Sequence, residues 1–573
     1  MKLFPAIGLA AALIALPQAD AVAARARDKL PTQATDPLQL PTYNATVERV
    51  QRALAQAHYY TGPINGRFSK ETETAIRNYQ RREGLPQNPV ASEELAVHIE
   101  TSAKVQSLLK QLQRQRLSKM DEARKALLAS PETRNLIGDP ENSDTKATVG
   151  RDAAPCFASP TPKCLLDEAS MSAIAIFKTE LRDWVLGEIL VAKAKAGLVA
   201  EAMQTVRLID DPRLILVALR DIAKALAAAG RPVEALSAAD IIPDMEKRLE
   251  ALAAIASVQI NREDFDGAAD TAQSLLDALD QISSPLKRIS LAARAAIILA
   301  KSGEKEPAEK ELAKIKVTIQ SGIEDRQRSI ALRHLASALA ETGKPEQALD
   351  ILKDLPDDSE RTPVLVSAAT AQAQAGNARQ AISTAESIEP VRYRAIVLSS
   401  IAVAQVKAGK ATAGRETLDK ALQAASGIKR PFARAYAYER ISLALMEIAR
   451  LDDPQTFQQA IDTAGLISDN KLRAHSLWSL GTGQLLAGDE KGAAKTNEMA
   501  EHATKEIKSP FTRVWMFTEI ALEHFSMQRK SAAWTAFTRA LTIAEGIESA
   551  WGRSRALARL ASSLIELGET MKK

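Results

Sequence analysis

Residues 328–348, RSIALRHLASALAETGKPEQA, contain the pattern that decides the fold of this chain. Arg328 is followed eight residues later by Ala336, seven later by Gly343 and five later by Ala348. Apolar residues recur at helical spacing before the Gly, and helices commonly end on Gly because it adopts a left-handed backbone without a Cβ penalty. The Pro at 345 suits the first turn of a following helix. The segment therefore predicts a helical hairpin.

The same pattern recurs from Arg182 to the end of the chain. The Arg column consists of Arg182, Arg248, Arg288, Arg328, Arg361, Arg394, Arg434, Arg473, Arg513 and Arg553, and Ile215 replaces it in one unit. The small column, eight residues later, consists of Ala223, Ala256, Ala296, Ala336, Ala369, Ala402, Ser442, Gly481, Ala521 and Ala561. A residue without bulk at one fixed place predicts a close approach of two helices. Units of 33 to 40 residues with one hairpin each predict an α-solenoid, and a longer unit should lengthen its second helix by a heptad.

These residues resemble the tetratricopeptide-repeat family, whose hairpin has Gly, four residues and then Ala. The resemblance covers residues 164–573 as about ten hairpins plus a C-terminal helix. Leu219, Ala223 and Leu226 stand where the family has Trp, Gly and Tyr, so the packing is aliphatic. The resemblance implies an all-α superhelical solenoid that binds protein partners, but the architecture alone does not identify them.

The N-terminus has the layout of a secretory signal peptide. Lys2 precedes an apolar run over residues 7–16, followed by Pro17 and small residues. The run is too short to cross a membrane, so residues 1–23 predict export without an integral membrane segment after cleavage at Ala21, Ala23 or Ala24. Residues 24–43 lack periodicity and predict a linker.

The composition points away from several function classes. The chain has 75 basic and 71 acidic residues, a net charge of +4 over 573 residues, which gives no nucleic-acid signal. The six His residues lack metal-ligand spacing, and neither a Gly-x-Ser-x-Gly motif nor a phosphate loop occurs. We therefore expect no metal, no cofactor and no catalytic residue.

Residues 44–101 predict a small three-helix bundle, with a turn between its first two helices. We expect Phe68, Ile76, Tyr79 and Leu85 to form its core. The segment resembles the peptidoglycan-binding domain-like family, whose pattern appears here as Val50-Gln51-x-x-Leu54, Tyr60-x-Gly62-x-x-Asn65-Gly66-x-Phe68, Thr72, Ala75, Tyr79-Gln80 and Gly84-Leu85. The family's second Asp-Gly turn is replaced by residues 87–90, QNPV. The resemblance implies peptidoglycan binding.

The site residues that this resemblance implies are Tyr59, Tyr60, Gly62, Asn65, Gly66, Arg67 and Gln80. An alternative is that the glycines and Phe68 merely build the bundle. Tyr59, Asn65, Arg67 and Gln80 are the polar residues expected to face a ligand.

The next segments lead into the solenoid. Residues 102–129 predict one amphipathic helix with Val105, Leu108, Leu109, Leu112 and Leu117 at helical spacing, for which packing on a neighbouring domain or a membrane-surface role is open. Residues 130–163 predict an extended tether. Cys156 and Cys164 are the chain's two cysteines, and in an exported chain they predict a disulfide that braces the solenoid's entrance.

Two motifs that suggest enzymes have structural explanations. Glu548-Ser549 is similar to a lytic transglycosylase motif, but the repeat register aligns it with inter-unit turns. Gly481-Thr-Gly483 begins like a dinucleotide loop but lies in mid-helix. The Arg column follows an Ile by six residues, which predicts that the Arg caps the preceding helix rather than forming a basic stripe.

The partner site is predicted from positions two and five after the Arg column, which project into the concave surface in the resembled family. Tyr436, His475 and Trp515 occupy position two in three consecutive units, and Trp478 occupies position five. In a chain with 4% aromatic residues, this spacing predicts an aromatic groove for a partner. The alternative is that these side chains only fill their hairpins.

Together, the patterns predict a non-enzymatic periplasmic or cell-envelope scaffold that binds peptidoglycan through the bundle and envelope proteins through the solenoid. The alternative from another class is a cell-wall hydrolase, or the dedicated activator of a cell-wall enzyme.

Overall fold

The computed structural model describes residues 43–137 and 152–568. The predicted signal peptide and almost all of the predicted linker 24–43 therefore lie outside the described residues. The regular elements of the described residues are all helices. They belong to two compact units, Met1–Arg116 and Leu117–Lys573.

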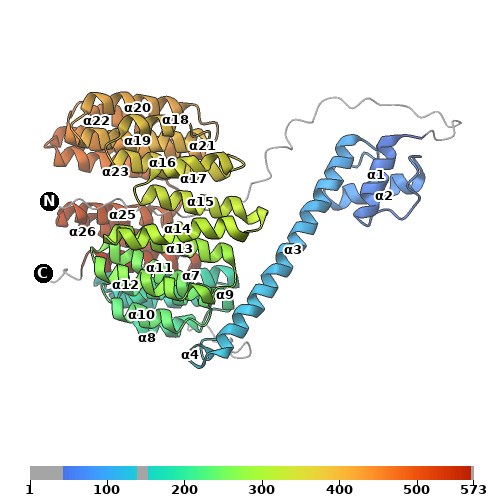
Figure 1. The fold of residues 1–573 in the computed structure, drawn as a ribbon, viewed down its shortest axis with the longest axis horizontal. Coiled ribbons are helices and arrows are strands. Elements are labelled where there is room, and N and C mark those ends of the chain that lie inside the picture. Colours follow the sequence, from blue (N-terminus) through green and yellow to red (C-terminus); the bar gives the residue numbers. More distant parts are fainter. Residues whose placement is uncertain (1–42, 138–151, 569–573) are drawn as a thin grey trace. The chain divides into compact units, whose positions relative to one another are not determined.

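The first unit is built from α1 (Ala45–Gln56), α2 (Lys70–Arg82) and the first turns of α3 (Glu93–Ala129), drawn in blue in Figure 1. The Asn44 and Ser69 side chains accept backbone N–H groups at the starts of α1 and α2, as N-caps do. The core side chains are Val50, Leu54, Tyr60, Ile76, Tyr79 and Ile99. Three helices thus form one bundle.

Helix α3 differs from the sequence prediction because it is continuous. It runs through residues 101–102, where we expected a boundary, since neither Gly nor Pro occurs along its 37 residues. Its middle carries the exposed side chains of Val105, Leu108, Leu109, Leu112 and Leu117. Their packing on a neighbouring domain stays a prediction. Ala123 and Leu127, near its end, belong to the core of the second unit.

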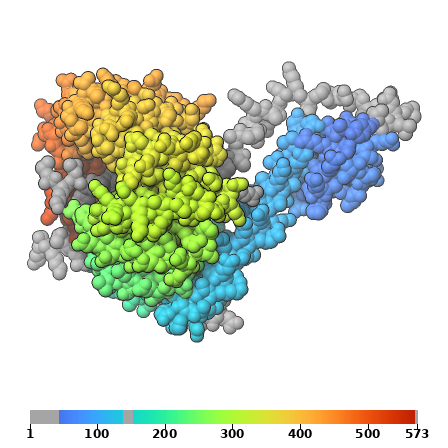
Figure 2. Space-filling view, viewed as in Figure 1, coloured from blue at the N-terminus to red at the C-terminus, as the bar shows by residue number. Residues whose placement is uncertain are grey.

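The second unit is a repeat of helical hairpins, which confirms the predicted all-α repeat fold. The first helices are α7 (Thr179–Lys195), α9 (Pro212–Ala228), α11 (Met245–Asn261), α13 (Pro285–Ser302), α15 (Asp325–Glu341), α17 (Asp358–Gln374), α19 (Val391–Lys407), α21 (Pro431–Leu451), α23 (Asn470–Leu486), α25 (Pro510–Ser526) and α27 (Ala550–Glu566). In Figure 1 the hairpins stack side by side in chain order. Figure 2 shows the green, yellow and orange hairpins as one continuous body.

The second helices vary in length as the unit lengths do. They are α8 (Val199–Val206), α10 (Pro232–Asp240), α12 (Phe265–Asp277), α14 (Lys305–Gly322), α16 (Pro345–Asp350), α18 (Ala378–Glu386), α20 (Ala411–Ser426), α22 (Thr456–Gly465), α24 (Glu490–Lys505) and α26 (Lys530–Glu545). Short 3₁₀ segments, Leu279–Gln281 and Ile351–Asp354, follow α12 and α16. The 39-residue unit departs from the expected pattern, because its extra residues lengthen the first helix, α21.

The repeated residues have the structural roles that their positions predict. Gly197, Gly230, Gly303, Gly343, Gly376, Gly409, Gly488 and Gly568 have positive φ at the ends of first helices. Column arginines donate to the carbonyl six residues earlier, as Arg248 does to Ile242, Arg361 to Leu355 and Arg394 to Ile388. The small column is fully buried from Ala223 to Ala561, and a Cβ added to Gly481 would lie 2.0 Å from Asn497 Oδ1.

The array closes on itself. Each first helix packs against the next, and the last one, α27, packs against the first, α7. The second helix that α27 would otherwise lack is supplied by α6 (Pro162–Ile174), which precedes α7 in the chain. We expected α27 to be a lone C-terminal helix, and the structure corrects this. Eleven hairpins form a ring within the described residues, with the first helices on its inner side.

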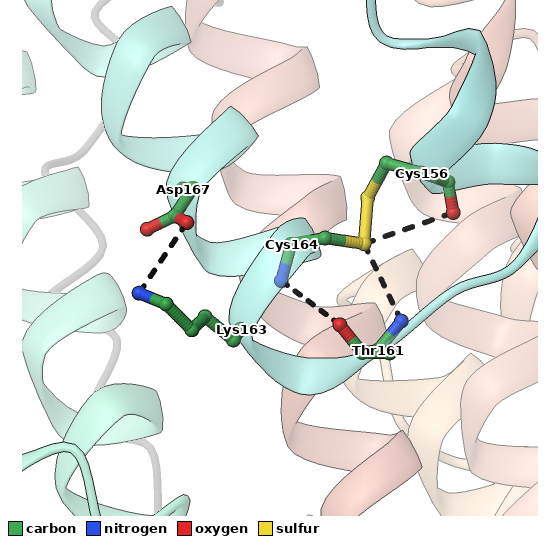
Figure 3. The surroundings of a disulfide bond; sticks show 5 residues. All are labelled: Cys156, Thr161, Lys163, Cys164 and Asp167. Atoms are coloured by element: carbon green, nitrogen blue, oxygen red, sulfur yellow. Dashed lines mark hydrogen bonds and ion pairs between the residues drawn. A yellow bond between two sulfur atoms is a disulfide. The ribbon is translucent and has the colours of Figure 1, made fainter.

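A disulfide confirms the predicted pairing beside this junction. Cys156 of α5 (Ala154–Ala158) is bonded to Cys164 at the start of α6, and Thr161 caps α6 by accepting the Cys164 N–H (Figure 3). Phe157 and, before the undescribed residues 138–151, Leu136 are buried in the ring's core. The described ends of the predicted tether therefore pack into the ring rather than forming an extended chain.

Candidate functional site

The turn between α1 and α2 is held by the side chain of Gln51, which is fully buried. Its Oε1 accepts the backbone N–H groups of Asn65 and Gly66, each at 3.0 Å. Its Nε2 donates to the Arg67 carbonyl and to Thr72 Oγ1, each at 3.0 Å. A buried amide with all its groups paired fixes the backbone around it, so Gln51 positions residues 65–67 without facing a ligand itself.

Three of the predicted site residues build this turn. Tyr60 is buried and its hydroxyl donates to the Pro63 carbonyl at 3.0 Å. A Cβ on Gly62 would lie 2.7 Å from the Tyr60 ring, so only glycine fits there. Gly66 has φ +69° and lies against Tyr43, so position 66 also requires glycine. The bundle-building alternative accounts for these three residues.

The exposed part of the turn includes Ile64, Asn65, Arg67 and Phe68. Asn65 Oδ1 accepts the Arg67 N–H at 3.0 Å, which orders the loop. Phe68, which we expected in the core, is 37% exposed, because the Gln51 network rather than Phe68 fills the space under the turn. An aromatic ring beside an Arg and an Asn on a fixed loop can bind a ligand with both apolar and polar groups.

Two further predicted residues lie apart from the turn's exposed loop. Tyr59 is half-buried against the edge of Tyr79, and the Arg82 guanidinium lies 5.9 Å from its ring centre. Gln80 is buried, and its Nε2 donates to the Asn88 carbonyl at 2.5 Å. Among the described groups, nothing donates to Gln80 Oε1. Gln80 therefore orders the 87–90 segment, where the family's second turn would lie.

The predicted aromatic groove of the second unit is only partly formed by the residues that we chose. Trp478 Nε1 donates to Thr504 of α24 at 3.1 Å, and the Arg539 guanidinium of α26 lies 5.3 Å from the Trp478 ring centre. Trp478 thus packs against second helices, on the outer side of its hairpin. The hairpin-filling alternative is correct for this residue.

Tyr436 and His475 lie on successive first helices and differ in exposure. Tyr436 is 44% exposed. Burial by itself lowers the pKa of the His475 imidazole, but the interaction with Glu439 and the charges of Glu523 and Glu519 outweigh burial and raise it. His475 Nδ1 lies 3.6 Å from Glu439 Oε1. The inner surface here is therefore aromatic with carboxylates beside it.

Trp515 belongs to a cluster of side chains at the junction of α27 with α7. The members of this cluster come from parts of the chain that are far apart in the sequence. Arg555 of α27 donates to Glu188 of α7 through Nε and Nη2, each at 2.9 Å. The Arg555 guanidinium lies 4.4 Å from the Phe511 ring centre, 4.7 Å from that of Trp551 and 5.6 Å from that of Trp184. Ring closure thus brings residues from both ends of the array together.

Beside this cluster lies a cavity of about 550 Å³. It is lined by residues of α7, α9, α25 and α27, among them Trp184, Val191, Leu214, Asp221, Trp515 and Arg559. Arg559 lies over the Trp515 ring at 4.6 Å and donates from Nε to Thr518 Oγ1 at 2.9 Å. The size is within the range of small-ligand pockets. Trp184 stands two residues after Arg182, the first arginine of the Arg column. It therefore occupies position two of the repeat, and this position is the signal that would have predicted it as a member of the site.

The motifs that suggested enzymes have structural roles. Ser549 caps α27 by accepting the Gly552 N–H at 3.4 Å, and Gly481 and Gly483 lie within α23. Among the described residues, no group of His, Cys, Asp and Glu side chains is arranged to hold a metal ion. None of the described helices is both long and apolar enough to cross a membrane.

A comparison with protein families assigns the first unit. Residues 43–96 match the family described as putative peptidoglycan binding domain. This segment is therefore similar to that domain family. The match covers α1, α2 and the first residues of α3, which include the turn held by Gln51. No curated protein is significantly similar to the chain.

Three solved structures with similar segments are distant from this chain. A protein of Thermococcus onnurineus is 18% identical, with 58% of this chain and 97% of that chain covered and a TM-score of 0.27. Human IFIT1 bound to PPP-AAAA is 13% identical, with 72% and 99% covered and a TM-score of 0.25. A signal transduction ATPase of Pyrococcus horikoshii with a tetratricopeptide repeat sensor is 14% identical, with 70% and 72% covered and a TM-score of 0.22.

Proposed function

We propose that this protein is a non-enzymatic scaffold of the cell envelope, which binds peptidoglycan through the bundle and protein partners through the ring. The match of residues 43–96 to the peptidoglycan-binding family carries the first half of this proposal. A family match at this turn and an exposed loop of suitable chemistry point to the same surface. The Cys156–Cys164 disulfide fits an oxidising compartment outside the cytoplasm.

The proposed contact surface is the exposed loop, Ile64, Asn65, Arg67 and Phe68. Its backbone is fixed before a ligand arrives, because Gln51 accepts from Asn65 and Gly66 and donates to the Arg67 carbonyl. Preorganisation of this kind reduces the entropy lost on binding. Arg67 suits the carboxylates of stem peptides, and Phe68 suits apolar faces of sugars or side chains.

A sedimentation assay with purified, insoluble peptidoglycan tests the bundle. The intact protein should pellet with peptidoglycan, and the Arg67→Ala/Phe68→Ala variant should pellet about tenfold less at limiting concentration. Arg81→Ala is the matched control, because Arg81 is exposed near the opposite end of α2. A wild-type protein that stays in the supernatant refutes peptidoglycan binding.

The same incubation distinguishes a scaffold from a hydrolase. The soluble fraction is analysed for released muropeptides after prolonged contact with the wall. We expect none above the level of a heat-inactivated sample. Release that depends on the folded protein would overturn the non-enzymatic part of the proposal.

A further inference from the structure

Ring closure makes position two of the repeat a cyclic column rather than a line with two ends. Reading around the inner side, the residues of five successive first helices are Tyr436, His475, Trp515, Arg555 and Trp184. We call these five residues the inner arc. It crosses the junction between α27 and α7, where Arg555 lies near Trp184. The chain's aromatic residues at this position are therefore gathered on one side of the ring.

The rings of the inner arc are held in place while part of their surface stays accessible. Trp515 Nε1 donates to Glu519 at 2.6 Å, and Trp184 Nε1 donates to Glu188 at 3.2 Å. Tyr436 and Trp184 are 44% and 57% exposed. The indole N–H groups are thus satisfied within the protein, and the apolar faces and edges are what remains for a ligand.

Carboxylates lie beside four of the five residues of the inner arc. Glu439 lies beside His475, Glu519 beside Trp515, and Glu188 beside both Trp184 and Arg555. A carboxylate has about four acceptor positions, so Glu519 and Glu188, whose side chains are 32% and 28% exposed, can accept further hydrogen bonds, whereas Glu439 is only 10% exposed. Flat apolar surfaces alternating with acceptors match pyranose sugars, which have C–H faces and hydroxyl donors.

The spacing of the inner arc suits a polymer. Neighbouring packed helices lie roughly 8–10 Å apart, so successive position-two residues repeat at a distance comparable to a disaccharide. The cavity of about 550 Å³ at Trp184 and Trp515 provides a recessed subsite along this path. By contrast, the larger cavity of about 950 Å³ among α12, α13 and α14 is lined by Lys305, Glu306, Lys310 and Glu311 and by no aromatic residue.

We propose that the inner arc binds the glycan chain of peptidoglycan, as a second contact separate from the bundle. The proposal rests on the proposed function, because the family of the bundle is what suggests a glycan of N-acetylated amino sugars as a ligand of this chain. Arg559 adds a cation at the cavity that can meet acidic groups carried by such a chain.

Tryptophan emission can test the ring separately from the bundle. The chain's five tryptophans, Trp184, Trp478, Trp515, Trp534 and Trp551, all lie in the second unit. The intact protein is titrated with a soluble N-acetylglucosamine hexasaccharide and, in parallel, with a stem tetrapeptide. We expect a saturable emission change with the hexasaccharide alone.

Single substitutions locate the contact. Trp184→Ala, Trp515→Ala and Tyr436→Ala should each weaken the apparent affinity by roughly fivefold to tenfold. Trp534→Ala, on the second helix α26, is the matched control and should bind as the wild type does. Tyr436→Ala keeps all five reporters, and circular dichroism checks that helicity is retained.

The outcomes separate this inference from the function of the bundle. An emission change with the peptide alone, no change with the hexasaccharide, or an unchanged affinity in all three arc variants overturns the inner-arc proposal. Sedimentation with peptidoglycan that depends on Arg67 and Phe68 would then still stand. If the Arg67→Ala/Phe68→Ala variant sediments as the wild type does while the arc variants lose hexasaccharide binding, the bundle's role is refuted and that of the ring is kept.

Discussion

Closure of the ring can be tested at the ion pair between Arg555 and Glu188, which are 367 residues apart in sequence. The perturbations are Arg555→Gln, Glu188→Gln and the double substitution. Gln at 188 retains an acceptor for the Trp184 indole N–H, so the cycle isolates the pair. An open array would leave the two side chains far apart, with a coupling energy of zero.

The expected coupling follows from the geometry. Unit charges 4 Å apart interact by about 4 kcal/mol at an effective dielectric constant of 20. The two side chains are 13% and 28% exposed, so solvent screening and the cost of desolvation reduce this value. The two-point hydrogen bonding adds to it. We therefore expect a coupling of about 1–2 kcal/mol.

The assay is urea denaturation followed by circular dichroism on the four proteins. A closed ring has no free end from which unfolding can begin, so the transition should be more cooperative than in an open repeat array. A parallel cycle on Lys301 and Glu341, which pair at 3.1 Å between the neighbouring helices α13 and α15, serves as control. Coupling below about 0.3 kcal/mol at Arg555 and Glu188, with the control pair still coupled, would refute the closure.

Two further predictions concern single residues at the end of α25. Gln528 has φ +61° at the register position where other units have Gly, so Gln528→Gly should raise the free energy of unfolding by about 0.5–1 kcal/mol in urea, whereas Gln528→Ala should not. Burial and the nearby Arg529 charge lower the pKa of His524 to about 4. The unfolded chain therefore binds a proton first, and stability should fall between about pH 6.5 and pH 4. His524→Gln should flatten this part of a pH-dependent melting profile, and an unchanged profile would contradict the assignment.

The hairpins were predictable because their signals are local. Gly343 ends a helix through its own backbone, and Arg394 reaches a carbonyl only six residues away. Two of the three units without the Gly still follow the register, because Glu263 and Gln528 adopt positive φ at the same position, whereas Ala449 lies within the lengthened helix α21. Interactions within one unit are repeated in the sequence, so the repetition itself made them visible.

The chemistry of the first unit was harder to assign residue by residue. The turn motif identified the right loop, but it did not separate residues that hold the loop from those that it presents. Gln51 is buried and Phe68 is exposed, although Phe68 is the more apolar of the two. The difference arises because a buried amide can pair with four backbone and side-chain groups at once, which compensates its desolvation.

Closure was not predictable from the repeat pattern because it depends on the sum of small rotations between all units. Position two of the first unit, Trp184, and of the last, Arg555, are at opposite ends of the repeat and neighbours in space. Trp478 shows the converse, since it lies within the aromatic run in sequence yet packs against second helices. Because we chose residues from consecutive units of the sequence, we included Trp478 in the groove and did not include Trp184. A patch on a closed repeat is defined by register position and cyclic order, so substitutions at Trp184 and Trp515 should affect one ligand alike, whereas Trp478→Ala should act mainly on stability.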